Sequence, residues 1–246
     1  MLYHAIGLMS GSSLDGLDLA FCRLEERGGN WTYEIEQAVC MPFPPSWSGV
    51  LPQCATLPAK ELLRLHTAFG IYLGECINTF IQQYDLQHRV QLVAAHGHTV
   101  FHNPAQQFSF QLGHGAALAA TCGLPVISEL RAVDMVLGGQ GAPIVPVGEK
   151  LLWQEYDYFL NLGGICNISI TGTHPIAFDI APCNRVLNLL AMQEGNPMDL
   201  HGMRAREGRF HKELFEQLNA LDYYKQPAPK SLPNEFGTEI IMHMID

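Results

Sequence analysis

The sequence has few charged residues, and few of these are basic. Charged residues make up 15% of the 246, and 14 Lys and Arg against 24 Asp and Glu give a net charge of −10 at pH 7. Nucleic-acid binding needs a lysine- and arginine-rich surface, so we expect no nucleic-acid partner. An acidic protein can still bind a nucleotide, because backbone N–H groups can hold phosphates without side-chain charge.

The chain also lacks paired cysteines and long apolar runs. Its seven cysteines are odd in number and widely spaced, without a C-x-x-C pair, which indicates reduced thiols in the cytoplasm rather than a disulfide framework. No stretch approaches the roughly 18 apolar residues of a membrane span, and no basic segment opens the chain as in a signal peptide. We therefore expect a cytoplasmic protein without a membrane partner.

Strand and helix patterns alternate along the chain, which predicts an α/β fold. Strands are predicted at residues 2–8, 17–24, 34–41, 90–95, 109–112, 125–129, 158–162, 166–171 and 176–179. Helices are predicted at residues 59–83, 115–122, 184–192 and 212–221. The hydrophobic share of 48% is enough for a sizeable core, which excludes a disordered chain.

A strand, a glycine turn and a second strand open the chain, and the same arrangement begins again near residue 158. The two units share no close sequence identity, so the repeat is one of topology. It predicts two α/β domains, residues 1–150 and 151–246, that each present a glycine turn to one cleft.

The first glycine turn lies within Gly7–Asp18 and matches neither a Walker A loop nor G-x-G-x-x-G. Its glycines allow close backbone approach, its serines offer hydroxyl groups, and its aspartates could orient water or hold Mg²⁺. The alternative is a polar hairpin tip. The candidate phosphate-binding residues are Gly11, Ser12, Ser13, Leu14, Asp15, Gly16, Leu17 and Asp18.

The second turn contains Gly163 and Gly164 and leads to Asn167. A Gly-Gly pair at a hairpin is usually structural when taken alone. Asp179 follows at the predicted end of a strand, just before a helix, where ligands gather in open α/β sheets. It is a candidate general base, and an N-cap is the alternative role.

Three histidines, His96, His98 and His102, form an H-x-H-x-x-x-H cluster at a strand end. Alternate strand residues share a face, so His96 and His98 could chelate a metal. No carboxylate or cysteine has a suitable spacing to complete such a site, which favours hydrogen bonds to a polar substrate or to the loop. Arg131 and Asp134 could likewise contact a substrate or pair with each other.

The chain resembles the anhydro-N-acetylmuramic acid kinase family, which belongs with sugar kinases, actin and heat-shock ATPases. The matching blocks are MSGSSLDGLD at 9–18, HGHTVFH at 96–102, QLGHG at 111–115, RAVD at 131–134, GGQGAP at 138–143, NLGGICNI at 161–168, and Phe178-Asp179 with Pro182 and Asn184. Asp199, Gly202, Ala205 and Gly208 match more weakly. These ordered blocks are far more specific together than any single turn.

The resemblance implies a two-domain, actin-like (ribonuclease-H-like) sugar kinase fold that uses ATP and Mg²⁺. ATP would phosphorylate the 6-oxygen of 1,6-anhydro-N-acetylmuramic acid while water opens the anhydro ring, in cell-wall sugar recycling. Asp179 would activate the water, and the two glycine turns would hold the nucleotide. Substrate-binding residues would be His96, His98, Arg131, Asp134 and Asn184, with no protein metal ligand assigned. A homodimer is also implied.

The chain departs from the family at Ser12, where Thr is usual, at His98, where Gln is usual, and at Ile180–Cys183, where Thr-Gly-Pro-Gly is usual. Family members also continue beyond residue 246 with a glycine-rich turn that holds adenosine, so the second domain is expected to be truncated. Two alternatives follow. One is an inactive or regulatory sugar-binding protein without the adenosine wall, and the other is a metal-dependent hydrolase that uses the histidines.

Overall fold

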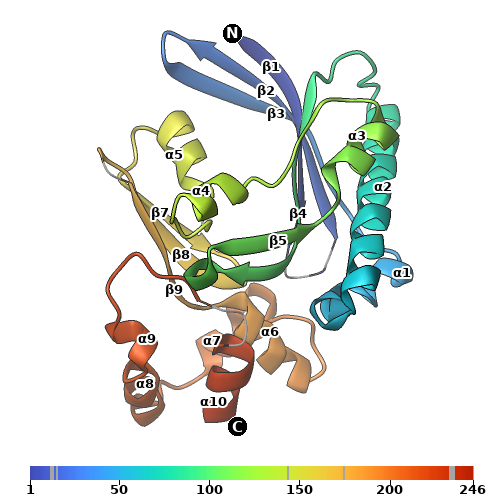
Figure 1. The fold of residues 1–246 in the computed structure, drawn as a ribbon. Helices are drawn as coiled ribbons and strands as arrows, with labels where there is room; N and C mark the ends of the chain where they lie inside the picture. Colours follow the sequence, from blue (N-terminus) through green and yellow to red (C-terminus); the bar gives the residue numbers. More distant parts are fainter. Residues whose placement is uncertain (12–13, 15, 143, 174, 233–235, 246) are drawn as a thin grey trace. The chain divides into compact units, whose positions relative to one another are not determined.

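The computed structural model describes residues 1–246 except 12–13, 15, 143, 174, 233–235 and 246. The chain divides into two compact units, Met1–Gly141 and Ala142–Asp246. Each unit has its own sheet and helices (Figure 1), so the chain is a mixed α/β protein as predicted. No helix among the described residues is long and apolar enough to cross a membrane.

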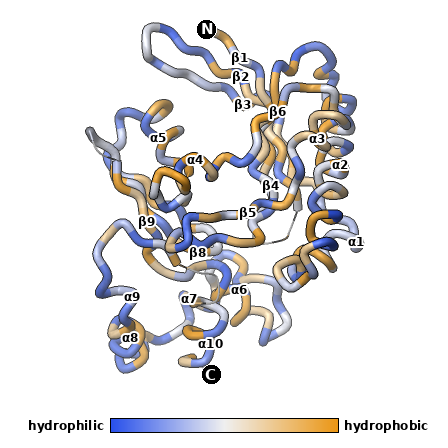
Figure 2. Tube along the Cα trace, viewed as in Figure 1, coloured by the Kyte–Doolittle hydropathy of each residue, from blue (hydrophilic) through white to orange (hydrophobic). Residues whose placement is uncertain are grey.

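Unit 1 is built on a mixed sheet in the order β3-β2-β1-β4-β5, with β6 also paired to β4. Its strands are β1 (Leu2–Ser10), β2 (Leu17–Arg27), β3 (Asn30–Met41), β4 (Leu92–Asn103), β5 (Phe108–Leu112) and β6 (Val126–Ile127). The β1–β4 and β4–β6 pairs are parallel and the other pairs are antiparallel. The turn between β2 and β3 is hydrophilic (Figure 2), which suits an exposed hairpin tip.

One face of this sheet packs on α2 (Ala59–Gln83), the helix predicted from its apolar spacing. Phe69, Leu73, Ile77 and Phe80 recur at helical intervals and are completely buried. They join alternate residues of the strands, which point to the same face of the sheet. The helix α3 (Gly115–Cys122) lies beside α2 (Figure 1). Unit 1 also contains α1 (Pro45–Ser48), α4 (Ala132–Val136) and the 3₁₀ turns η1 (Leu51–Thr56) and η2 (Pro104–Gln106).

Unit 2 has an antiparallel sheet in the order β7-β8-β9. These strands are β7 (Tyr158–Leu162), β8 (Ile165–Ile170) and β9 (Ile176–Pro182). The helical elements are α5 (Pro146–Leu152), α6 (Asn184–Gln193), η3 (Leu200–Gly202), α7 (Met203–Glu207), α8 (Lys212–Asn219), α9 (Asp222–Lys225), the π-helix η4 (Phe236–Ile241) and α10 (Met242–Ile245).

The core of unit 2 draws on the helices and on the segment that follows α9. Its buried residues are Val186, Tyr223, Leu232, Phe236, Ile241 and Met242. The described residues after 235 are helical and contribute half of this group. Burial of their apolar side chains explains why this short segment is ordered as a helix.

Candidate functional site

The first glycine turn joins β1 to β2, and Ser12, Ser13 and Asp15 lie outside the described residues. Leu14 has a left-handed backbone (φ 60°), and its N–H donates to the Gly11 carbonyl at 3.4 Å. At Gly16 a Cβ atom would stand 2.6 Å from the Met41 carbonyl oxygen. Only glycine fits there, since backbone atoms cannot move aside as a flexible side chain can. The end of β3 therefore supports the turn at Gly16.

Leu17 and Asp18 follow this turn and point to opposite faces of the sheet. The Leu17 side chain is fully buried in the core, so only its backbone is available to a ligand. Asp18 is exposed, in register with Met9 and Cys40 on the face opposite α2.

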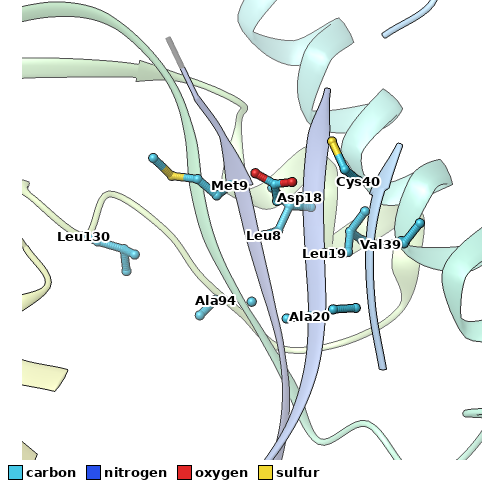
Figure 3. Close-up of a pocket in the computed structure, with 11 residues that line it drawn as sticks. Leu8, Met9, Asp18, Leu19, Ala20, Val39, Cys40, Ala94 and Leu130 are labelled. Atoms are coloured by element: carbon cyan, nitrogen blue, oxygen red, sulfur yellow. The ribbon is translucent and has the colours of Figure 1, made fainter. Parts of the chain in front are cut away.

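An open furrow of about 610 Å³ runs along this face (Figure 3). Its floor is a row of small residues in register across four strands, namely Ala94, Gly7, Ala20 and Ala38. The Asp18 carboxylate stands at the end of the furrow next to the turn. Small side chains leave the backbone accessible here, and among the described residues the Asp18 carboxylate is the one charged group that lines the furrow.

His96 is buried inside β4, which continues to Asn103 and so corrects the prediction that the strand ends before the histidines. Nδ1 donates to the Gly97 carbonyl at 3.0 Å, and Nε2 accepts from Arg131 Nε at 2.9 Å. Because a carbonyl only accepts and a guanidinium only donates, these bonds place the proton on Nδ1. Burial, followed by the Arg131 charge, lowers the pKa of His96 to about 4. The imidazole is therefore neutral near neutral pH.

His98 and His102 bind other partners. His98 Nδ1 lies 3.0 Å from the Ser10 hydroxyl of β1, and His102 Nδ1 lies 3.3 Å from the Ser109 hydroxyl of β5. Burial lowers the pKa of both imidazoles. His102 Nε2 is buried and has no hydrogen-bond partner among the residues that the structure describes.

The regular strand alternation assumed for the metal alternative is wrong at Gly97. Gly97 has φ 72°, and β4 places two residues, His96 and Gly97, opposite Met9 of β1. This is a β-bulge, which turns the side chains away from simple alternation. Within the described ranges, no group of three His, Cys, Asp or Glu side chains is arranged to hold a metal ion.

Arg131 and Asp134 hold the loop that ends unit 1. Arg131 Nη1 donates to the Gly141 carbonyl at 2.6 Å, and the Gly141 N–H donates to Asp134 Oδ2 at 2.7 Å. The Gly139 N–H also donates to the Asp134 carbonyl, and a Cβ at Gly139 would collide with the Asp134 carboxylate. The two charged residues thus both bond to the loop at Gly141, and Arg131 connects this loop to His96.

The second glycine turn joins β7 to β8 and caps helix α6. The Gly163 carbonyl accepts from the Asn184 N–H, and the Gly164 carbonyl accepts from the Cys183 and Arg185 N–H groups at 3.0 and 3.2 Å. Asn184 Nδ2 also donates to the Leu162 carbonyl at 2.8 Å. The first N–H groups of a helix lack partners inside the helix, and here the turn supplies them.

A polar row crosses the sheet of unit 2. Asn167 of β8 is in register with Asn161 of β7 and with Asp179 of β9. Residues directly opposite one another in an antiparallel sheet point to the same face, so these three side chains lie together. Sequence reasoning did not select Asn161 as a site residue. The sequence carries two signals for it, since Asn161 is a polar residue within the apolar strand 158–162 and begins the block NLGGICNI at 161–168.

Asp179 lies inside β9, which corrects the prediction that the strand ends there. The strand continues to Pro182 because Ile165 and Cys166 of β8 still pair with Pro182 and Ala181, with Ile180 as the extra residue of a bulge. The alternative role of Asp179 as an N-cap is wrong, since Cys183 is the N-cap residue of α6. The Asp179 Oδ2 atom accepts from the Leu232 N–H at 2.8 Å.

Comparison with known proteins gives one family. The profile of the anhydro-N-acetylmuramic acid kinase family matches residues 3–241. Proteins named anhydro-N-acetylmuramic acid kinase from Salinibacter ruber and Haemophilus influenzae are each 32% identical over 98% and 94% of this chain, and one from Rhodospirillum rubrum is 34% identical over 98%. The matches cover 66%, 63% and 66% of these relatives, so the chain spans about two thirds of their length. The resemblance drawn from the motif blocks is confirmed, and the chain belongs to the anhydro-N-acetylmuramic acid kinase family.

Proposed function

We propose that this chain is an ATP-dependent phosphotransferase. It converts 1,6-anhydro-N-acetylmuramic acid to N-acetylmuramic acid 6-phosphate, with hydrolytic opening of the anhydro ring. The observation that carries the proposal is the row Asn161–Asn167–Asp179, which sets one carboxylate directly beside an amide near the second glycine turn. Family membership and the names of the relatives supply the substrate.

The sheet order β3-β2-β1-β4-β5 supports an actin-like (ribonuclease-H-like) kinase fold with a first domain built on this sheet. The β7-β8-β9 sheet would then belong to the second domain, of which the chain holds a part.

The first turn suits the phosphates of ATP, since its sequence is rich in small residues and its described residue Gly16 packs closely on the end of β3. Asp18 is the described carboxylate beside this turn and would contact Mg²⁺, directly or through water. Mg²⁺ usually binds one or two carboxylates together with substrate phosphates, so a single aspartate fits. When bound, the ion neutralises phosphate charge. On the second turn, Gly163, Gly164 and Asn167 would contact the nucleotide.

In the proposed reaction, Asp179 takes a proton from water as the water oxygen bonds to carbon 1 of the sugar. The bond from carbon 1 to the bridging oxygen breaks. That oxygen stays bonded to carbon 6 and receives the terminal phosphoryl group of ATP. ADP leaves, and the proton on Asp179 returns to solvent. Alignment of these groups supplies much of the rate enhancement.

In unit 1, the residues proposed to contact the sugar are His96, His98, Arg131 and Asp134, and in unit 2 the proposed contact is Asn184. The network in unit 1 suits the hydroxyl groups of a sugar, because its imidazoles are neutral and its one guanidinium is held by a carbonyl and an imidazole. We further propose a cytoplasmic homodimer that acts in cell-wall sugar recycling, in keeping with the free cysteines of the chain.

The test is a coupled assay of ADP release with the anhydro sugar and Mg-ATP, alongside calorimetry with each ligand. Turnover by the wild-type chain supports the proposal, and we expect Asp179→Asn to lower kcat by about 10²–10⁴-fold because the base is lost. The exposed Asp157→Asn is the matched control and should keep full activity. Sugar binding without ATP binding or turnover would favour the sugar-binding alternative. Normal turnover by Asp179→Asn would remove Asp179 as the base.

A further inference from the structure

A strap borders β9 at Asp179. We use this name for Gln226–Leu232, the described part of the segment between α9 and η4. The β9 strand is the last in the sheet order, and the strap bonds to it at Asp179 on both main chain and side chain. The Asp179 N–H donates to the Lys230 carbonyl at 3.0 Å, and the Leu232 N–H donates to Asp179 Oδ2 at 2.8 Å.

The strap is itself anchored through Lys230 and Tyr223. Lys230 Nζ donates to the carbonyls of Tyr223 at 2.9 Å and Gln226 at 3.2 Å, and it lies 4.5 Å from the centre of the Tyr223 ring. The Tyr223 hydroxyl donates to the Asp179 carbonyl at 2.7 Å. Burial, with the Asp179 charge as the next cause, raises the pKa of Tyr223, so the hydroxyl keeps its proton and stays a donor. Asp179, Lys230 and Tyr223 therefore each contact the other two.

Two of the residues that bond to Asp179 lie in the core of unit 2. Tyr223 and Leu232 are 6% and 5% exposed, and both belong to the buried cluster that includes Phe236. A hydrogen bond from an N–H to a carboxylate is charge-assisted and directional. The Leu232 N–H is thus a rigidly held donor that selects one oxygen and one rotamer of the Asp179 side chain.

We propose that this strap positions the Asp179 carboxylate for its work as a base. The inference rests on the proposed function, in which one carboxylate oxygen must face the attacking water. The Leu232 N–H fixes the orientation of the carboxylate through Oδ2, and the Tyr223 hydroxyl fixes the position of the backbone from which the side chain projects. Tyr223, Lys230 and the Leu232 N–H are positioning groups, since they act through Asp179.

The first test requires no activity. In ¹H–¹⁵N spectra of the full chain, the Leu232 amide proton should shift in one step as pH is raised through the ionisation of Asp179. Asp179→Asn should abolish the step. Absence of a step in the wild type would overturn the inference, whether or not the chain turns over. A step without any turnover would support the contact and count against the proposed function alone.

The second test separates positioning from folding. Replacing Leu232 by its α-hydroxy acid turns the N–H into an ester oxygen and leaves the side chain intact. We expect kcat to fall about 10- to 100-fold with unchanged KM for sugar and ATP. The acid limb of the pH–rate profile should move to higher pH, because a carboxylate that loses a hydrogen-bond donor has a higher pKa. Tyr223→Phe should lower kcat in the same direction. Tyr224→Phe is the matched control, because its ring also packs on Phe236. Unchanged kcat and an unmoved acid limb in the ester variant would overturn the inference.

Discussion

His96 shows how a single buried polar residue is stabilised in unit 1. Its 5% exposure removes it from water, and two hydrogen bonds replace the lost solvent contacts. Both bonds require the neutral ring with its proton on Nδ1. Protonation would put a second positive charge beside Arg131 in a buried place, which explains the lowered pKa.

This pKa shift makes a prediction about stability and pH. The folded-state pKa of about 4 lies below the ordinary value of 6.5, so the unfolded chain binds the proton first as pH falls. The contribution of His96 to stability is complete above pH 6.5 and is lost between there and pH 4, by up to about 3 kcal/mol. His96→Gln, which keeps an acceptor for Arg131 but does not titrate, should flatten this part of the pH dependence.

The measurement is the free energy of unfolding in urea at a series of pH values for both proteins. His88→Asn, at an exposed position with a left-handed backbone, is the control and should keep the wild-type slope. A His96→Gln slope equal to that of the wild type would show that another group causes the acid sensitivity.

At the scale of elements, close packing of α2 against α3 depends on glycine. A Cβ added at Gly74 would stand 2.5 Å from the Thr121 Cβ, and one at Gly70 would stand 2.5 Å from the His114 carbonyl oxygen. Two helices can approach this closely only where one presents no side chain. His114 is also the N-cap residue of α3, and its Nδ1 accepts from the Ala117 N–H.

We therefore expect Gly74→Ala to destabilise the protein, by about 1–3 kcal/mol from overpacking. This cost outweighs the gain of about 1 kcal/mol that alanine brings to a helix interior. Thr67→Ala, on the exposed side of the same helix, should change stability by less than about 0.5 kcal/mol. Urea unfolding followed by circular dichroism gives both values. A stabilised Gly74→Ala variant would mean that α3 moves aside without cost.

At the scale of the whole molecule, the two units have separate cores. Phe80 is completely buried in unit 1 against the sheet, whereas the core of unit 2 gathers around Tyr223 and Phe236. Tryptophans report on each unit separately. Trp47 packs on Phe69 and Tyr72 in unit 1, and Trp153 packs on Phe159 in unit 2.

Phe80→Ala should therefore act mainly on unit 1, at a cost of about 3–5 kcal/mol, because it leaves a cavity under the sheet. Urea unfolding of single-tryptophan versions should show a larger fall in the Trp47 midpoint than in the Trp153 midpoint. Phe210→Ala, with a side chain 75% exposed, is the control and should move neither midpoint appreciably. Equal shifts at both tryptophans would show that the units unfold as one.

The sequence by itself determined most elements of both sheets, the long helix and the family. Strand alternation and helical spacing are local consequences of which side chains are buried, so they can be seen in any short window. The pairing of β1 with β2 across a glycine turn and of β7 with β8 across another follows from short connections, which leave neighbouring strands little choice. The motif blocks identified the family because their residues and their order can be compared along the sequence without knowledge of the fold.

Only the tertiary structure decided which of these residues meet. Asn161 joins Asn167 and Asp179 through strand register, and the bulge at Ile180 carries β9 beyond Asp179. The Leu232 N–H reaches the Asp179 carboxylate across 53 residues of sequence, and Arg131 reaches His96 across 35. No short window contains such pairs, because bulges, loop paths and the packing of distant helices set them, and these depend on the whole fold.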